Sequence, residues 1–215
     1  MKMKYSINKT RALSWSAISS FEYDPEQWFK RYVLNEKSRE TGAMMFGKEI
    51  GEKLASDPKF MPEVPRLPLY EYKLFSTLKY SKCGDIRHAH IPKCYEELSL
   101  IGYIDAFDLK KKKMLEFKTG KKWDKDKAEN HGQIDLYCAM IYSMHKIRPE
   151  ELDINLVWMA TEETGDFTTQ FVKDMQPVVF PVKKTIMDVL NMLARVKRVY
   201  KEMEDYVEMK NKLST

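Results

Sequence analysis

The stretch that decides the fold is LSLIGYIDAFDLKKKKMLEFKTG, residues 98–120. Apolar residues alternate with others on both sides of four consecutive lysines, a pattern that predicts two antiparallel strands joined by a turn. Glu116 and Lys118 share one face of the second strand, because residues i and i+2 point the same way. An ordinary half-buried strand would turn this pair to solvent, whereas a metal-dependent active site would hold it in a cleft. The rest of the chain has to decide between these interpretations.

Asp105 lies near the end of the first strand of this hairpin. If the turn centres on 110–113, Asp105 and Glu116 are cross-strand neighbours, so that two carboxylates converge with Lys118. Hydrolysis of a phosphodiester requires carboxylates that hold metal ions and a cation that orients water or stabilises developing charge. Mg²⁺ suits such a site because it binds few protein carboxylates and keeps several waters. The hairpin therefore predicts this chemistry, provided that the face is a cleft.

The remaining pattern predicts a single α/β domain, with a central mixed β-sheet flanked by helices, a helical N-terminus and a long C-terminal helix. Two helices separated by a break at Asp24-Pro25 are expected over 14–33, with Ser16 and Asp24 as N-caps. The other expected elements are a helix over 43–56, strands over 69–80 and 96–118, a helix over 131–147, strands over 154–160 and 167–172, and an amphipathic helix from 183 to about 209. The domain, 1–215, would comprise a helical part (1–60), a core carrying the site (69–180) and a C-terminal helix (183–212).

Charge is concentrated around the hairpin. The net charge of the chain is +5, but residues 110–127 hold nine lysines and three acidic residues. This local excess favours a polyanionic partner, nucleic acid first, although a solvated lysine-rich turn would give the same pattern. Lys112, Lys121 and Lys122 are candidate DNA contacts, and Trp123 among them could stack on an unpaired base.

Three cysteines in 215 residues indicate a reducing compartment without a disulfide framework. The first twenty residues lack the apolar core of a secretory signal, and no apolar run is long enough to span a membrane. We therefore expect a cytoplasmic protein with no membrane partner. Cys83, His88, His90 and Cys94 are of zinc-ligand type but lack the usual CxxC spacing. A zinc-stabilised adaptor and a hairpin with incidental cysteines both remain open.

Three motifs in order resemble those of a known family: GYID (Gly102–Asp105), EFKTG (Glu116–Gly120) and QIDLY (Gln133–Tyr137). They look like the motifs of the PD-(D/E)XK nuclease superfamily, and most like its RecB-like branch of recombination nucleases and CRISPR-associated exonucleases. SAISSFEYDPEQWFKRYV (16–33) and FGKEIGEKL (46–54) resemble the N-terminal motifs of that branch. The resemblance covers about residues 14–140 and implies a restriction-endonuclease-like core.

The resemblance implies roles for residues of the hairpin. Asp105, Glu116 and the backbone carbonyl of Phe117 would bind Mg²⁺ or Mn²⁺, and Lys118 would position the attacking water and stabilise the transition state. The implied activity is that of a metal-dependent DNA nuclease, preferably an exonuclease acting on single- or double-stranded DNA with free ends. Its setting would be phage or bacterial recombination, repair or replication. No G-x-x-x-x-G-K-[ST] motif is present, so a recombinase, helicase or single-strand-binding protein would be a separate partner.

The other motifs carry further roles and one departure. Gln133 would orient Lys118 or the phosphate, with Tyr137 one helical turn beyond; a solvated glutamine and a tyrosine at the edge of the core are the alternative. Many relatives place a metal-binding histidine where this chain has Gly51. Glu52 could supply an acid in its place, although a surface charge is the competing interpretation. Glu49 is a poorer candidate for the same role.

A second departure concerns cysteine. Members of the branch with an iron–sulfur cluster have a cysteine just before the proline of the first motif and three more near the C-terminus. This chain has Asp24 at the first position and, after Gln133, Cys138 alone. We therefore expect no Fe–S cluster. The departure at Gly51 keeps an alternative function open, that of a catalytically inactive nuclease-fold module that binds DNA or a protein.

Overall fold

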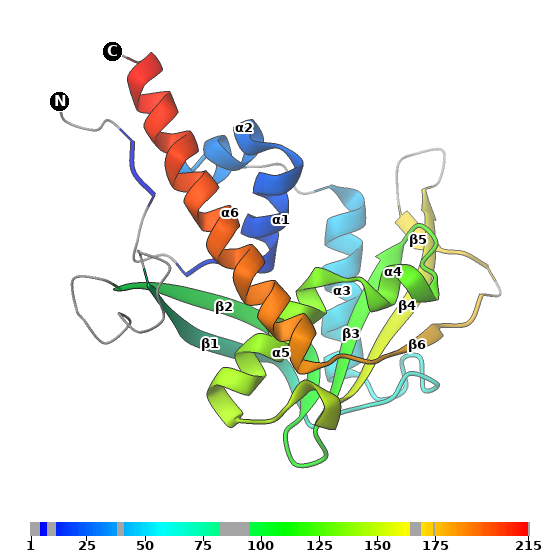
Figure 1. Cartoon of the computed structure of the whole chain (residues 1–215). Coiled ribbons are helices and arrows are strands. Elements are labelled where there is room, and N and C mark those ends of the chain that lie inside the picture. The colour runs from blue at the N-terminus through cyan, green and yellow to red at the C-terminus, as the bar shows by residue number, and fades with distance from the viewer. Residues whose placement is uncertain are drawn as a thin grey trace.

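A mixed six-stranded sheet lies at the centre of the structure, with its strands in the order β1–β2–β3–β4–β5 and with β6 also paired to β4 (Figure 1). The structure is a computed structural model that describes residues 5–7, 12–37, 41–81, 95–163, 169–173 and 175–214. The strands are β1 (Leu69–Ser81), β2 (Tyr95–Asp108), β3 (Lys113–Gly120), β4 (Asp153–Glu163), β5 (Thr169–Phe171) and β6 (Val178–Val182). The helices are α1 (Trp15–Tyr23), α2 (Pro25–Trp28), the π-helical turn η1 (Phe29–Val33), α3 (Gly42–Ser56), α4 (Lys125–Glu129), α5 (Gly132–His145), the 3-10 turn η4 (Pro149–Glu151) and α6 (Ile186–Leu213). The expected α/β fold, with a helical N-terminus and a long C-terminal helix, is confirmed.

The hairpin that decides the fold forms as the alternation predicts. β2 and β3 are antiparallel, with Ala106 opposite Leu115 and Asp108 opposite Lys113. β3 then runs parallel to β4 from Lys113 to Gly120. A parallel pair needs a crossover connection, and α5 provides it by lying across one face of the sheet (Figure 1). The sheet is therefore mixed, and its centre is the strand that carries Glu116 and Lys118.

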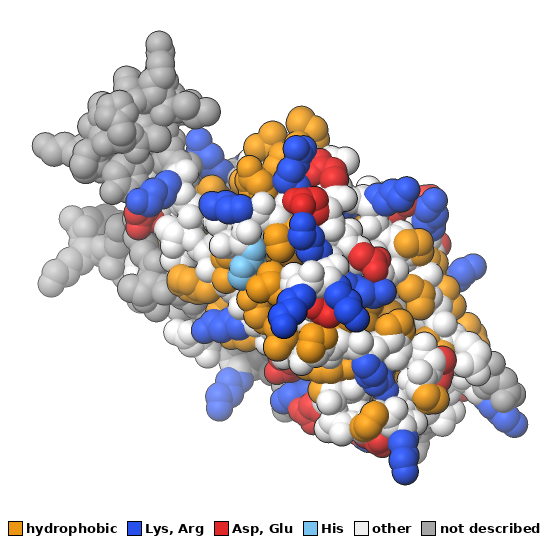
Figure 2. All heavy atoms as spheres, turned by 90° about the horizontal axis from the view of Figure 1, so that it is seen from below, with side chains coloured by type: hydrophobic (Ala, Val, Ile, Leu, Met, Phe, Trp, Pro, Cys, Tyr) orange, Lys and Arg blue, Asp and Glu red, His pale blue; other side chains and the backbone are white. Residues whose placement is uncertain are grey.

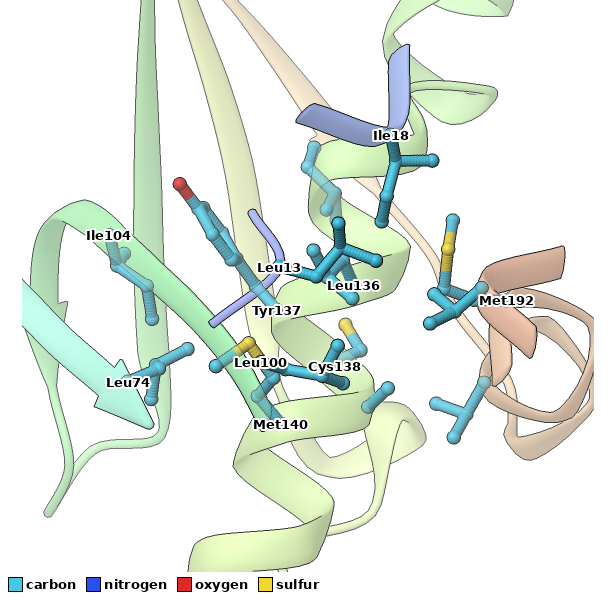
Figure 3. Packing of buried hydrophobic residues seen from close by; sticks show 14 of the residues in the cluster. Leu13, Ile18, Leu74, Leu100, Ile104, Leu136, Tyr137, Cys138, Met140 and Met192 are labelled. Carbon is cyan, nitrogen blue, oxygen red and sulfur yellow. The ribbon is translucent and has the colours of Figure 1, made fainter. Parts of the chain in front are cut away.

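Two apolar cores cover the two faces of the sheet. On one face α1, α5 and α6 pack on the strands, and Figure 3 shows Tyr137 and Met140 of α5 beside Leu100 of β2. On the other face Ile50 of α3 belongs to a smaller cluster with Leu115 of β3. Helices thus lie on both faces of the sheet, and β3 is buried on both faces from Met114 to Glu116.

Some boundaries and faces differ from the sequence-based expectation. The N-cap of α1 is Ser14, whose side chain accepts a hydrogen bond from the N–H of Ala17, whereas Ser16 was expected. Leu190 was expected on the buried stripe of the last helix but is 51% exposed. α4 and β6 were not expected, because one is a five-residue helix in a lysine-rich loop and the other contains Pro181, which usually argues against a strand. Asp24 caps α2, with Pro25 at its first position, as expected.

The last helix ties the N-terminal part to the rest of the molecule. The side chain of Asn211 accepts a hydrogen bond from the N–H of Tyr5 and donates one to its carbonyl. Arg195 forms a bidentate ion pair with Glu22 of α1. α1 is therefore held between α6 and the sheet. Within the described part of the chain, no helix is both long and apolar enough to cross a membrane.

Candidate active site at the open end of the β2–β3 hairpin

Asp105 lies where β2 and β3 separate, at a point that we call the fork. The register that pairs Ala106 with Leu115 would next place Asp105 opposite Glu116, but the backbone pairing stops there. Instead, Oδ2 of Asp105 accepts a hydrogen bond of 2.7 Å from the N–H of Phe117. The carboxylate thus fills the opening of the fork and satisfies a backbone donor that the ladder leaves free. The expected closeness of Asp105 to the Glu116 segment is confirmed.

Glu116 and Lys118 face the layer of α5, and not the solvent. Glu116 is only 1% exposed, and one of its carboxylate oxygens, Oε1, lies 2.6 Å from Nζ of Lys118. The other oxygen, Oε2, is buried and receives no hydrogen bond from a donor of the described residues, although the Asp105 carboxyl is close enough to share a proton with Glu116. A buried, unpartnered carboxylate oxygen is costly unless a cation or a donor completes it. This pair therefore does not belong to an ordinary half-buried strand.

A chain of hydrogen bonds from α5 fixes Lys118. Nζ of Lys118 donates to Oε1 of Gln133 at 2.8 Å, and Nε2 of Gln133 donates to the hydroxyl of Tyr137 at 2.6 Å. The Tyr137 hydroxyl donates to the carbonyl of Tyr103 on β2 at 2.5 Å. Along this chain each group donates a hydrogen bond to the next one. The Gln133 amide must therefore turn its oxygen to Lys118 and its nitrogen to Tyr137. The structure brings Gln133 and Tyr137 to Lys118 as the resemblance implied.

Gly102 explains how α5 comes so close to β2. A Cβ atom at Gly102 would lie 2.6 Å from a ring carbon of Tyr137, closer than packed atoms allow. The glycine of the GYID motif therefore makes room for the tyrosine of the QIDLY motif. The two motifs are far apart in sequence, and this contact is the physical reason for their occurrence together.

The protonation states of the site follow from its burial. Burial, reinforced by the nearby Asp105 carboxylate, raises the pKa of Glu116 to about 8, although Lys118 acts in the opposite direction. Burial also raises the pKa of Asp105, against the attraction of Lys118 and the hydrogen bond from Phe117. One ammonium group cannot balance two buried carboxylates, and the short contact of Lys118 with Glu116 is possible whether that carboxyl is neutral or ionised. The burial of two carboxyl groups beside one ammonium group therefore favours a proton, or another cation, in the site in addition to Lys118.

His131, at the N-cap of α5, is a site neighbour that the sequence did not single out. Its Nε2 lies 3.2 Å from Oε1 of Gln133, which can only accept, so Nε2 carries the hydrogen. Burial, and next the charge of Lys118, lower the pKa of His131 to about 4. A neutral imidazole therefore assists in orienting Gln133. The only signal in sequence was its position two residues before Gln133.

Trp123 does not lie where a base could stack on it. It is 9% exposed, and its ring packs edge-on against His131 at 5.1 Å. Nζ of Lys127 lies over the ring at 4.3 Å. The expectation that Trp123 presents a free face to DNA is therefore wrong, because the short helix α4 folds the loop back on the tryptophan. Here its ring packs against His131.

Helix α3 flanks the other side of the fork. A cavity of about 430 Å³ is lined by Gly51 and Glu52 of α3 together with Asp105 and Phe117. A Cβ atom at Gly51 would meet nothing within 4 Å, so there is open space beside the fork at this position. Glu52 is exposed at this cavity and is available to it. Glu49 instead forms an ion pair with Lys53 on the helix surface, at 2.6 Å. This agrees with the expectation that Glu49 is a poorer candidate than Glu52 for a metal ligand.

Glu71 of β1 is an acidic residue that sequence reasoning missed. The pairs Tyr70–Ala106 and Tyr72–Ile104 flank it, so it lies across from Asp105 on the neighbouring strand. It lines the same cavity and has a φ of +47°, which is uncommon for a residue with a side chain. From the alternating pattern of β1, Glu71 would be expected to face the solvent. Only the pairing of β1 with β2 shows that it lies across from Asp105.

The residues present fit a Mg²⁺ or Mn²⁺ ion held with few protein ligands. In the described part of the chain, no three His, Cys, Asp or Glu side chains come close enough to hold a metal by themselves. Asp105, Glu116 and the carbonyl of Phe117 would supply the ligands, with water completing the shell, which is the coordination that Mg²⁺ prefers. The unpartnered Oε2 of Glu116 is the observation that favours such an ion.

The basic stretch is divided between the two ends of β3. Lys112 pairs with Glu151 at 2.5 Å, and Lys113 with Asp153 at 3.0 Å, at the hairpin turn. Lys112 is four residues before Glu116, about 13 Å along the strand direction, and Lys121 is three residues after Lys118, about 10 Å. Figure 2, which views the molecule from below, shows basic side chains interspersed with acidic and hydrophobic ones. Lys112 is therefore held by Glu151 at the turn, whereas the exposed Lys121 and Lys122 directly follow the end of β3 that carries Lys118.

The zinc candidates Cys83, His88, His90 and Cys94 lie outside the described residues. Cys138 is buried in α5 and carries a free thiol.

Comparisons with known proteins address the fold. No protein-family model matches the chain, and no curated protein matches it in sequence. A crystal structure of a "Putative exonuclease" from Eubacterium rectale has a TM-score of 0.53 and 11% identity over 93% of this chain and 82% of that chain. The crystal structure of SSO0001 has a TM-score of 0.41 and 11% identity over 88% of this chain and 75% of that chain, too distant to carry an argument. At this identity the first similarity shows a shared fold and leaves residue roles to the geometry.

Proposed function

We propose that the chain is a metal-dependent DNA nuclease of the PD-(D/E)XK type, and that it acts as an exonuclease on DNA ends. The observation that carries the proposal is the convergence of Asp105, Glu116 and Lys118 at a fork in the sheet, with Glu116 buried and half-satisfied. The shared fold with a structure described as an exonuclease supports it. The order of the motifs, from GYID to QIDLY, agrees with the same assignment.

Each residue has a task that follows from its contacts. Asp105, Glu116 and the Phe117 carbonyl would hold the metal, which when bound supplies an activated water and offsets phosphate charge. Lys118, fixed by Gln133, presents its ammonium group to the attacking water or to the charge that develops on the phosphate. Because its position is set before substrate arrives, little reorganisation is needed during the reaction. Hydrolysis would leave a 5′-phosphate and a 3′-hydroxyl.

The scissile strand would enter between α3 and the end of β3. Gly47 and Gly51 lie one turn apart on α3, and each lines a cavity against Phe117. A Cβ at Gly47 would lie 3.1 Å from Oγ1 of Thr119, so the helix passes close to the strand there. Lys118 lines the cavity beside Gly47, of about 360 Å³. Lys121 and Lys122 extend this edge with exposed positive charge for the DNA backbone.

The test is degradation of end-labelled single- and double-stranded DNA in the presence of Mg²⁺, Mn²⁺ or EDTA. We expect metal-dependent loss of label for the wild-type protein, and a loss of activity of at least about 1000-fold for Lys118→Met, which keeps the length of the side chain. Lys59→Ala, a change at an exposed lysine of the loop after α3, is the control. Equal activity of Lys118→Met and Lys59→Ala would overturn the proposal. Cutting of closed circular DNA would show an endonuclease instead.

A binding module is the second candidate, and the open space at Gly51 favours it. A site that lacks the histidine of many relatives could hold DNA without cutting it. In this case wild type and Lys118→Met would both shift DNA on a gel and leave it intact at every metal concentration. The intact set of Asp105, Glu116 and Lys118 makes the nuclease the preferred function.

A further inference from the structure

We propose that a second cavity, between the N-terminal helices and β2, binds an unpaired nucleobase of the strand that is cut. It has a volume of about 450 Å³, in the range of small-molecule sites. Its apolar lining includes Leu13, Ile101, Tyr200 and Met203. The inference rests on the proposed function and names the part of the substrate that the protein would hold beside the scissile bond.

One buried donor in this lining has no partner. Trp28 lines the cavity and is 2% exposed, yet its indole N–H makes no hydrogen bond with any described residue. Buried N–H groups are nearly always paired, and an indole can only donate. The nitrogen itself is shielded from the cavity, so a ligand with an acceptor on its edge would pair with it only after the Trp28 ring turns toward the cavity. The ring nitrogens and carbonyl oxygens of a nucleobase are such acceptors.

Tyr103 supplies an aromatic surface at the rim. It lines the cavity and is 49% exposed, so part of its side chain is available to a ligand. Aromatic side chains that remain accessible are the usual stacking partners of unpaired bases. Arg31 also lines the cavity, and its guanidinium lies over the ring of Tyr32 at 5.4 Å. It has no ion-pair partner among the described residues and would meet the phosphate that accompanies the base.

The cavity and the candidate active site are linked through β2. Tyr103 and Asp105 are two residues apart on β2, a span of about 7 Å along a strand. The carbonyl of Tyr103 also accepts the hydrogen bond that ends the Lys118–Gln133–Tyr137 chain. A base held against Tyr103 would therefore place the phosphate of a neighbouring nucleotide near Asp105. An apolar peptide segment would have no such relation to the site.

The experiment measures binding and cutting of labelled single-stranded oligonucleotides that are either intact or abasic at the positions nearest the scissile phosphate. Binding is measured with Ca²⁺ in place of Mg²⁺, and cutting with Mg²⁺. We compare the wild-type protein with Tyr103→Ala, Trp28→Phe and the control Tyr142→Ala, which removes a 39%-exposed tyrosine from α5 outside the cavity. Trp28→Phe removes the donor and keeps an aromatic ring, and melting curves confirm that each variant is folded.

We expect Tyr103→Ala to weaken binding of the intact strand at least about fivefold, with Tyr142→Ala unchanged. The abasic strand should bind the wild-type protein as weakly as the intact strand binds Tyr103→Ala, and the two changes should not add. Independent, additive losses, or equal affinity of the wild-type protein for both strands, would overturn the cavity as a base site even if the protein cuts DNA. Binding with this pattern but without cutting would support the cavity and contradict the nuclease.

Discussion

The two sides of the Asp105–Glu116 fork are built differently. Toward α5, Lys118 is held by a chain of hydrogen bonds that runs through Gln133 and Tyr137 and ends at the carbonyl of Tyr103. Toward α3, the acids Glu52 and Glu71 border a cavity in which Gly51 leaves open space. The difference indicates that the protein fixes its own cation in advance and leaves the other side adjustable. Changes on the α5 side should therefore be costly, and changes on the α3 side should be mild.

The largest effect is expected at the fork itself. Asp105→Asn keeps the shape of the side chain and its acceptor for the N–H of Phe117, but it removes the charge that would hold a metal. We expect metal-dependent cleavage to fall by about 1000-fold or more, because charge stabilisation is the main contribution of such a site. The measurement is the initial rate of label release at saturating Mn²⁺. Cleavage within threefold of wild type would show that Asp105 is not a ligand.

A smaller loss of activity is expected when the hydrogen-bond chain from Lys118 to Tyr103 is interrupted. Tyr137→Phe leaves Nε2 of Gln133 and the carbonyl of Tyr103 without their partner. We expect the free energy of unfolding to fall by about 1–3 kcal/mol and activity by about 10- to 100-fold. Urea unfolding and single-turnover cleavage give the two numbers. Tyr142→Phe, on the exposed part of α5, should change neither, and equal behaviour of the two variants would contradict the role of the chain.

The pH dependence of stability tests the burial of Glu116. A carboxyl group whose pKa is higher in the folded protein binds its proton more tightly there, so the stability it provides is present at low pH and is lost as the pH rises. With a folded-state pKa of about 8 against an ordinary 4.5, this loss spans pH 4.5 to 8. Glu116→Gln cannot ionise, so in metal-free buffer it should become more stable than wild type across this window, by on the order of 2–4 kcal/mol.

The same group controls metal binding. Because the ligand must be deprotonated, the affinity for Mn²⁺ should increase with pH up to about 8 and then level off. Calorimetric titrations at several pH values measure this slope. The control Glu36→Gln changes an exposed carboxyl and should retain the wild-type curves for both stability and metal. A flat metal affinity between pH 6 and 8 would show that Glu116 is already ionised.

The smallest effects are expected on the α3 side. Gly51→His should tighten Mn²⁺ binding several-fold, because the position has room for a side chain beside Asp105. Gly51→Ala is the matched control, since it adds helix propensity, worth up to about 1 kcal/mol of stability, without a metal ligand. Glu52→Gln and Glu71→Gln should each weaken metal binding only a few-fold. A loss as large as that of Asp105→Asn would show that the open side is as essential as the closed one.

The sequence predicted those features of the fold and of the site that depend on local patterns or on the order of the motifs. The hairpin, the closeness of Asp105 to the Glu116 segment and the link from Gln133 to Lys118 all follow from spacing within single elements or from the resemblance. Glu71 and His131 could not be found in this way, because each acts through a neighbour that only strand pairing or helix docking brings near. Trp123 was misplaced for the same reason, since the fold of α4 over it leaves no mark on the local pattern.

The contacts between α6 and the N-terminal helices have a consequence for how the protein folds during its synthesis. A chain synthesised from its N-terminus produces α1 first, yet Phe21 and Phe29 find the ring of Tyr206 only when α6 has been completed. Until then these aromatic residues have no cover on that side, while the sheet and α5 can already assemble. We expect α1 and the turn after it to settle late in folding, and a pause in translation before residue 186 to leave them uncovered on this side.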